Sequence, residues 1–123
     1  MPTHTLEQII DDAFEHRSEL RLGHVPRDLA DALERVFLDL NAGVLRVCEK
    51  IDGAWVTHQW LKKAVLLSFR TQDNRVVESG AFTYYDKVPG RFEGYSDARF
   101  REGGFRVVPG AVVRNGSFIA RNS

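Results

Sequence analysis

The residue types that most often carry chemistry are few in this chain and lie far apart. The four histidines are His4, His16, His24 and His58, and none lies four residues from another. No cysteine or carboxylate cluster has the close spacing with which proteins hold zinc. The sequence therefore predicts no metal site and no bound cofactor.

Cys48 is the only cysteine, so a disulfide within the chain is impossible, as is usual for proteins of the reducing cytosol. It lies in an alternating strand pattern that lacks the surroundings of a nucleophilic thiol. We therefore expect an inert, packed side chain. No glycine-rich loop is followed by the lysine that a phosphate-binding loop requires.

Three other groups of residues could form part of a site. Arg106 stands between two apolar residues, and a guanidinium can bind a carboxylate through two hydrogen bonds, although a solvated surface arginine is the simpler interpretation. His58 could act as a general base, but it is more simply a residue at the start of a helix. The Tyr-Tyr-Asp-Lys run at 84–87 could form a polar site, and alternation explains it equally as a strand.

These residues depend on secondary structure for their positions, and the strongest signal is the apolar stretch from Trp55 to Arg70. A helix over 58–70 would be apolar around most of its surface and would therefore be buried. We expect Thr57 to cap its first turn. The narrow outward strip of this helix consists of Lys62, Lys63, Leu66 and Arg70.

Two amphipathic helices are predicted before this stretch. Over 5–17 the apolar residues recur with helical spacing, and Thr5 with Gln8 has the pattern of a capping box. Over 26–41 a second apolar stripe ends just before Gly43, which we expect in the left-handed conformation that ends many helices.

Antiparallel strands are predicted around these helices. Alternation over 44–57, together with Asp52-Gly53, indicates a hairpin closed by a type I′ turn. Short strands follow within 75–87, and a short helical turn is expected over 98–102.

The last part of the chain, 105–123, shows a six-residue repeat. Written in sixes from Val107, the first places are Val107, Val113 and Ile119, and the fourth places are Gly110, Gly116 and Asn122. Residues that tolerate positive φ at every fourth place suggest a corner every six residues, as in a left-handed parallel β-helix. An ordinary hairpin that turns at Asn115-Gly116 explains the same stretch equally well.

Composition limits the class of protein. The chain has 123 residues, with 17 Lys and Arg against 17 Asp and Glu. Such a balance argues against a nucleic-acid partner, which normally faces a basic surface. No apolar run is long enough to cross a membrane, and the N-terminus does not have the pattern of a signal peptide, so we expect a cytoplasmic protein.

Several sequence blocks resemble the N-terminal part of the tetrahydrodipicolinate N-succinyltransferase family. They are VLRV at 44–47, WVTHQWLKKAVLLSFR at 55–70, YDKVP at 85–89, GFRVVP at 104–109 and FIARN at 118–122. The periodicity and turn signals described above already predict an α+β fold. Residues 1–104 would form an N-terminal domain of three helices, a β-hairpin and short strands, and 105–123 would be the truncated start of a hexapeptide-repeat β-helix.

The resemblance also implies a function in lysine and diaminopimelate biosynthesis. Enzymes of this family transfer succinyl from succinyl-CoA, a co-substrate, to tetrahydrodipicolinate, and they are cytosolic homotrimers. In the family the arginine of the FRVVP block binds the dicarboxylate substrate, which here is Arg106. The family's acidic active-site residue and its CoA-binding surface have no counterpart in this sequence.

Two functions follow from this departure. The chain is the N-terminal part of the acyltransferase, inactive alone because most of the β-helix is absent, or it is a truncated, non-catalytic assembly or binding module. The sequence encoded directly after Ser123 separates these hypotheses, since a continued six-residue repeat favours the first.

Overall fold

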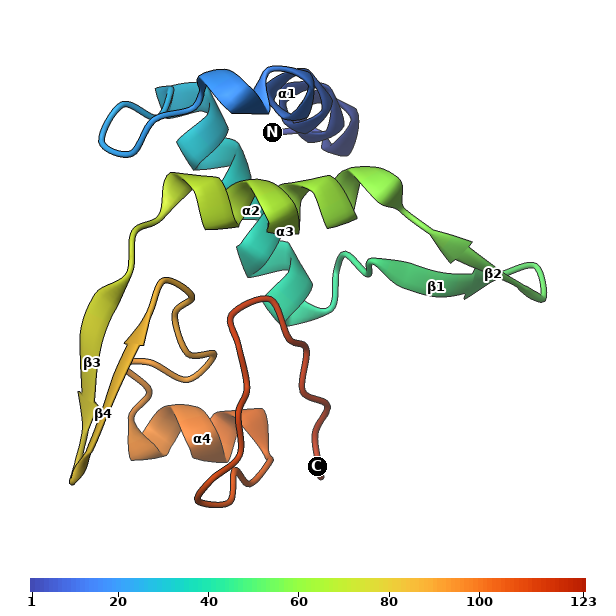
Figure 1. Ribbon diagram of the computed structural model, residues 1–123. Coiled ribbons are helices and arrows are strands. Elements are labelled where there is room, and N and C mark those ends of the chain that lie inside the picture. Colours follow the sequence, from blue (N-terminus) through green and yellow to red (C-terminus); the bar gives the residue numbers. More distant parts are fainter.

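Three helices pack together at one end of the protein, and two β-hairpins and a further helix extend from them (Figure 1). The structure is a computed structural model that describes residues 1–123. The helices are α1 (Thr3–Glu15), the short 3₁₀ helix η1 (Arg17–Glu19), α2 (Arg27–Ala42), α3 (Gln59–Thr71) and α4 (Asp97–Gly103). The strands are β1 (Cys48–Ile51), β2 (Ala54–Thr57), β3 (Arg75–Ser79) and β4 (Phe82–Asp86). Both strand pairs are antiparallel, so the predicted α+β class is confirmed.

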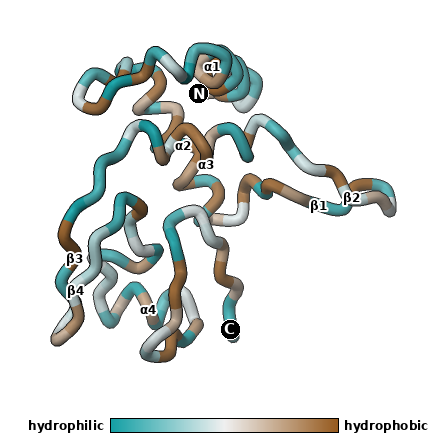
Figure 2. Tube along the Cα trace, viewed as in Figure 1, coloured by the Kyte–Doolittle hydropathy of each residue, from teal (hydrophilic) through white to brown (hydrophobic).

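The hydrophobic core lies where α1, α2 and α3 cross. Its members are Leu6, Ile10, Leu29, Ala32, Leu33, Val36, Leu40, Trp60, Leu61, Ala64 and Leu67. Figure 2 shows this crossing as the place where apolar segments of all three helices meet. The six-residue-repeat segment and both hairpins contribute no residue to this buried cluster, so the core belongs to the helices alone.

Helix α3 is the central buried element that the sequence predicts. Leu61 and Leu67 are almost fully buried. Three residues of the predicted outward strip are exposed, and only Lys63 is half-buried. Its ammonium group lies 2.9 Å from the carboxylate of Asp11 in α1, so this lysine pairs across the helix interface instead of extending into solvent.

Two predicted helix caps are wrong. Helix α1 begins at Thr3, after Pro2, and no side chain caps it, so Thr5 lies inside the first turn. Thr57 is the last residue of β2, and His58 takes the capping position of α3 without a side-chain cap. In each case the regular element extends past the polar residue from which the boundary was inferred.

The end of α2 determines where the first hairpin begins. Gly43 has the predicted positive φ of +75°. The N–H groups of Val44 and Leu45 donate to the carbonyl of Asp39, at 2.9 and 3.1 Å. Both N–H groups are bonded to this one carbonyl at the end of the helix, so they are not available to a strand. Strand β1 therefore begins only at Cys48, later than predicted.

The β1–β2 hairpin extends away from the helices as an arm (Figure 1). Asp52 and Gly53 have φ values of +50° and +81°, which confirms the predicted type I′ turn. Every residue of both strands is exposed. The expectation that Cys48 is packed is therefore wrong, since neither face of the arm lies on the core.

Hairpin β3–β4 connects α3 to the second half of the chain. Its strands pair from Arg75 opposite Asp86 to Ser79 opposite Phe82. Asp86 also forms an ion pair with Arg114, whose guanidinium lies 2.9 Å from the carboxylate. Lys87, just after β4, donates to the carbonyl of Phe69 in α3, at 3.3 Å. The strand interpretation is confirmed for residues 84–86, and Lys87 lies beyond the end of the strand.

The segment 105–123 has corners but no regular strands. Gly110, Gly116 and Asn122 have φ values of +90°, +101° and +68°, so the predicted turn every six residues is confirmed. A hairpin turning at residue 116 is not formed, since only an isolated bridge involves this segment, between Gly90 and Arg114. The predicted first coil of a β-helix is also not formed as β-structure. Strands of such a coil pair with the coils above and below them, and this chain contains no second coil.

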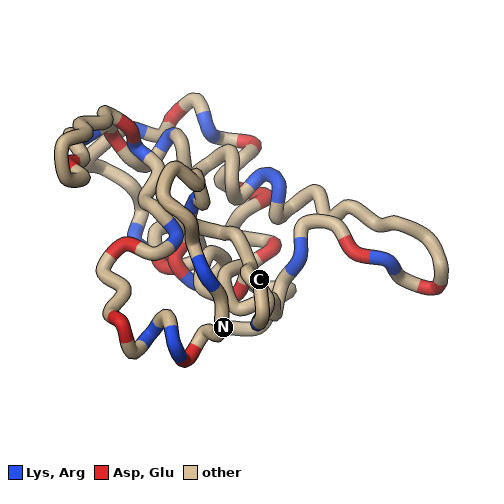
Figure 3. Tube along the Cα trace, turned by 90° about the horizontal axis from the view of Figure 1, so that it is seen from below, with Lys and Arg blue, Asp and Glu red and all other residues tan.

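Charges of both signs are interspersed over the protein. Figure 3 shows lysine and arginine alternating with aspartate and glutamate along the chain, as its equal numbers of each lead one to expect. None of the helices combines the length and the apolarity that crossing a lipid bilayer would require.

Candidate functional site

The predicted substrate arginine lies beyond α4, which an aromatic cluster holds in place. Ser96 caps α4, its hydroxyl accepting from the N–H of Arg99 at 3.2 Å. The ring of Phe92 lies within 5.5 Å of the rings of Phe100 and Phe105, measured between centroids. Phe105 is half-buried in this cluster, and Arg106, the next residue, is exposed.

Arg106 lines an open hollow at the end of α4. The hollow has a volume of about 420 Å³. Its lining residues are Phe100, Arg101, Gly104, Phe105, Arg106, Asn122 and Ser123. The wall is formed by two segments that are distant in sequence, the end of α4 with its following turn and the last residues of the chain.

Arg106 differs from the other arginines near α4 in having no partner. The guanidinium of Arg101 pairs with Asp97 at 2.7 Å, and that of Arg121 donates to the carbonyl of Glu102. Arg99 lies over the ring of Tyr95, with 4.0 Å between Cζ and the ring centroid.

Arg106 is exposed, and its side chain makes neither a hydrogen bond nor an ion pair in the structure. A free guanidinium at the wall of a hollow can bind a carboxylate through two parallel hydrogen bonds. The arrangement is therefore suited to an anionic ligand.

His58 is more than a first-turn residue. Its Nε2 lies 2.7 Å from a carboxylate oxygen of Glu49 in β1, so the pair ties the hairpin arm to the start of α3. Thr3, Glu7, Arg46 and Trp60 lie around the same small hollow. His58 does not belong to the hollow at Arg106, whose lining contains no histidine.

The remaining histidines do not come together. Across residues 1–123, no three histidine, cysteine, aspartate or glutamate side chains are grouped closely enough to hold a metal ion. His16 ends α1, and its Nδ1 donates to the carbonyl of Asp12 at 2.9 Å. That hydrogen bond, and then the nearby carboxylate of Glu19, raise the pKa of His16 above its ordinary value.

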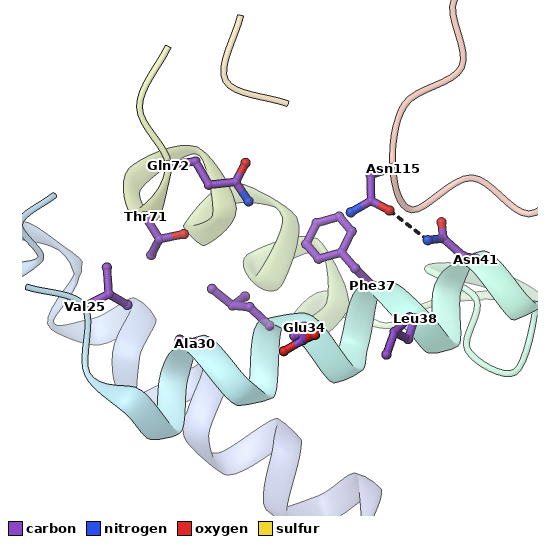
Figure 4. A pocket seen from close by; sticks show the side chains of 10 residues that line it. Val25, Ala30, Glu34, Phe37, Leu38, Asn41, Thr71, Gln72 and Asn115 are labelled. Atoms are coloured by element: carbon purple, nitrogen blue, oxygen red, sulfur yellow. Dashed lines mark hydrogen bonds between the residues drawn. The ribbon is translucent and has the colours of Figure 1, made fainter. Parts of the chain in front are cut away.

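Asn41 was not among the residues singled out by sequence, and the structure gives it a central position. At the end of α2 its side-chain nitrogen donates to Oδ1 of Asn115 at 2.7 Å, the bond drawn in Figure 4. Its side-chain oxygen accepts from the N–H of Gly116 at 2.6 Å. The partners lie more than 70 residues away, so no local pattern could have indicated this contact.

Arg91 supports the same junction from another side. Its guanidinium donates to the carbonyl of Ser117 at 2.7 Å and to that of Asn41 at 3.2 Å. It also donates to the hydroxyl of Tyr95 at 2.8 Å. The corner at residues 115–117 is thus held against the end of α2. Through Tyr95, Arg91 also connects this corner to the aromatic cluster beside α4.

A comparison with known protein families shows to which family this chain belongs. The profile of one family, described as Tetrahydrodipicolinate N-succinyltransferase N-terminal, matches residues 5–71. The chain belongs to this family. The matched region contains most of α1, all of α2 and α3, and the β1–β2 arm, so membership in the succinyltransferase family rests on the helical core and its hairpin.

Individual relatives cover more of the chain. A 2,3,4,5-tetrahydropyridine-2,6-dicarboxylate N-succinyltransferase of Dechloromonas aromatica is 54% identical over 121 residues, which is 98% of this chain and 44% of the relative. Enzymes of the same name from Yersinia enterocolitica and Yersinia pestis are 56% identical over 118 residues. The chain therefore spans about 44% of the length of the curated relatives it matches.

Proposed function

We propose that this chain is the N-terminal part of a cytoplasmic acyltransferase that moves succinyl from succinyl-CoA to tetrahydrodipicolinate, in lysine and diaminopimelate biosynthesis. The names of the relatives, at 54–56% identity over nearly the whole chain, support this function. The alternative is a non-catalytic assembly or binding module. Within the proposal the chain contributes to substrate binding, and the remaining chemistry belongs to the part of the relatives that has no counterpart here.

We further propose that residues 1–104 are the N-terminal domain and that 105–123 begin a left-handed β-helix in a homotrimeric enzyme. Corners at Gly110, Gly116 and Asn122 support this division. The N–H of Asn122 donates to the carbonyl of Gly104 at 2.6 Å, and these residues are three six-residue repeats apart. The backbone therefore returns to its starting position after the length of one triangular coil. A second coil stacked on this one would supply the strand pairing that residues 105–123 lack.

The observation that carries the proposed site is the unpartnered guanidinium of Arg106. A dicarboxylate offers the charge and the planar geometry that this group recognises, and no protein carboxylate competes for it. The hollow beside it is open to solvent and is formed by α4 and the returning end of the chain. Arg106 would therefore bind one carboxylate of tetrahydrodipicolinate, which leaves the rest of that molecule directed out of this domain.

The test of this role is a change in one Michaelis constant only. It requires the chain extended beyond Ser123 with the corresponding part of the Dechloromonas aromatica relative. Arg106→Ala should raise the KM for tetrahydrodipicolinate, since losing a charged hydrogen-bond pair costs about 2–5 kcal/mol. The KM for succinyl-CoA should stay nearly constant. Arg106→Lys keeps the charge but not the planar fork, so it should raise the first KM to a smaller extent.

A matched control is Arg27→Ala, which removes one positive charge from a side chain that is 93% exposed in α2. It should change neither constant. Equal changes in both constants for Arg106→Ala, or no change in a folded protein, would show that Arg106 is a solvated surface residue.

A further inference from the structure

Arg121 closes the end of the chain onto α4. Its guanidinium donates to the carbonyl of Glu102, one of the last carbonyls of α4, which have no partner within the helix. It also lies over Gly104, so closely that a Cβ at this glycine would stand 2.9 Å from Cζ of Arg121. Gly104 has a φ of +70° and ends the helix. The guanidinium of Arg121 therefore occupies space beside this turn that a Cβ at residue 104 would fill.

Two backbone hydrogen bonds lie beside the contact of Arg121 and flank Phe105. The N–H of Asn122, the residue after Arg121, donates to the carbonyl of Gly104 at 2.6 Å. The N–H of Arg106 donates to the carbonyl of Ser123 at 3.0 Å. These two hydrogen bonds join the backbone on either side of Phe105 to Asn122 and Ser123, the two residues that follow Arg121.

We propose that Arg121 is a positioning residue for Arg106. It would act through the Glu102 carbonyl and the Gly104 turn, and it would not touch the substrate itself. This inference rests on the proposed function, because a fixed Arg106 matters only if that guanidinium binds the acceptor. Two parallel hydrogen bonds between a guanidinium and a carboxylate are sensitive to small displacements. A more mobile backbone at Arg106 would therefore weaken binding of the dicarboxylate, although every group that contacts it would still be present.

The chemistry at this position favours arginine over lysine. A planar guanidinium can lie flat over the Cα of Gly104 while one edge donates to the Glu102 carbonyl. An ammonium group can supply the donor but not the flat contact. Arg121→Lys should therefore preserve part of the effect, and Arg121→Met, which keeps only the apolar stem, should abolish it. Gly104→Ala tests the same contact from the other side, because its Cβ would displace the guanidinium.

The first measurement is amide hydrogen exchange by NMR on the 123-residue chain. In Arg121→Met the N–H groups of Asn122 and Arg106 should lose their protection. The amides of Leu61 and Leu67 in the core of α3 should exchange as in the parent. The matched control is Arg101→Met, which removes an arginine that pairs within α4 and should leave Asn122 and Arg106 protected.

The second measurement is the kinetics of the extended chain. Arg121→Met should raise the KM for tetrahydrodipicolinate roughly 10–100-fold, as expected for a displaced binding group, with kcat and the KM for succinyl-CoA nearly unchanged. Arg121→Lys should restore part of that loss. A residue needed only for folding would lower the amount of active enzyme and leave the KM of the remainder unchanged.

The outcomes separate this inference from the proposed function. Unchanged protection at Arg106 in Arg121→Met would overturn the positioning role. So would an unchanged KM for tetrahydrodipicolinate in Arg121→Met when Arg106→Ala raises it. If Arg106→Ala itself leaves that KM unchanged, the proposed role of Arg106 is wrong, and the positioning inference fails with it whatever the exchange rates show.

Discussion

The side-chain oxygen of Asn41, at the end of α2, accepts a hydrogen bond of 2.6 Å from the backbone N–H of Gly116. The same amide donates to Asn115, so one side chain satisfies both residues of a corner. The helical core and the six-residue-repeat segment are thereby joined at a defined point. If the segment continues as a β-helix, this contact sets the position of its first coil relative to the core.

We predict that Asn41→Ala destabilises this junction by about 1–3 kcal/mol, the usual cost of leaving partly buried hydrogen-bond partners unpaired. Hydrogen exchange should show lost protection at the N–H of Gly116, and denaturant melts should give the change in unfolding free energy. Asn74→Ala is the matched control, since Asn74 is exposed and only its backbone N–H, not its side chain, forms a hydrogen bond. Equal melts for the two variants would contradict the role of Asn41.

The two glycine corners should differ in their tolerance of alanine. Both Gly110 and Gly116 have positive φ, which costs a residue with a Cβ about 1–2 kcal/mol. A Cβ at Gly116 would also lie 3.1 Å from the ring of Phe37, whereas nothing lies within 4 Å of one at Gly110. Gly116→Ala should therefore lower the free energy of unfolding more than Gly110→Ala does. The reverse order in denaturant melts would show that the middle corner does not pack on α2.

The burial of α3 is tested by a pair of neighbouring residues. Leu61→Ala should destabilise the protein by roughly 2–5 kcal/mol, as large-to-small changes in a packed core do. Lys62→Ala, on the outward strip, should lie within about 0.5 kcal/mol of the parent. Similar effects of the two substitutions in denaturant melts would contradict the packing described for this helix.

His16 should make stability depend on pH. Its Nδ1 donates to the Asp12 carbonyl, which favours the protonated ring and raises the pKa in the folded state. A raised pKa means that the contribution to stability is complete below the ordinary histidine value of about 6.5 and is lost as the pH rises through the folded value. His16→Gln can donate the same bond but does not titrate. The stability advantage of the parent over this variant should shrink from about pH 5.5 to about pH 8, and an advantage that grows over this range would contradict the assigned direction.

Local sequence signals predicted the regular elements well. The apolar periodicity of α2 and α3 and the Asp52-Gly53 turn each depend on residues close together in the chain, and the structure confirms them. Both predicted caps are wrong because Thr5, with Gln8, and Thr57 have local patterns typical of caps, while the neighbouring elements extend past them. Positive φ at every sixth residue of the last segment was also predictable, since glycine and asparagine favour that conformation.

The contacts that arrange these elements were not predictable from the sequence. Asn41, Arg91 and Arg121 act on partners that are distant in the chain, and nothing in their immediate neighbours distinguishes them from other polar residues. The same holds for Arg106, because its lack of a partner becomes visible only when the ion pairs of the surrounding arginines are known. Cys48 was expected to be packed because alternation indicates a strand but not whether anything covers it.

The most direct test of the proposed function is the release of CoA thiol from succinyl-CoA in the presence of tetrahydrodipicolinate. The 123-residue chain alone should show no turnover above background, because acyl transfer requires both substrates to be held together in one geometry. The same chain extended beyond Ser123 with the corresponding part of the Dechloromonas aromatica relative should show turnover that depends on both substrates. Turnover by the isolated chain, or none by a folded extended chain, would contradict the assignment of residues 1–123 as the N-terminal part of a succinyltransferase.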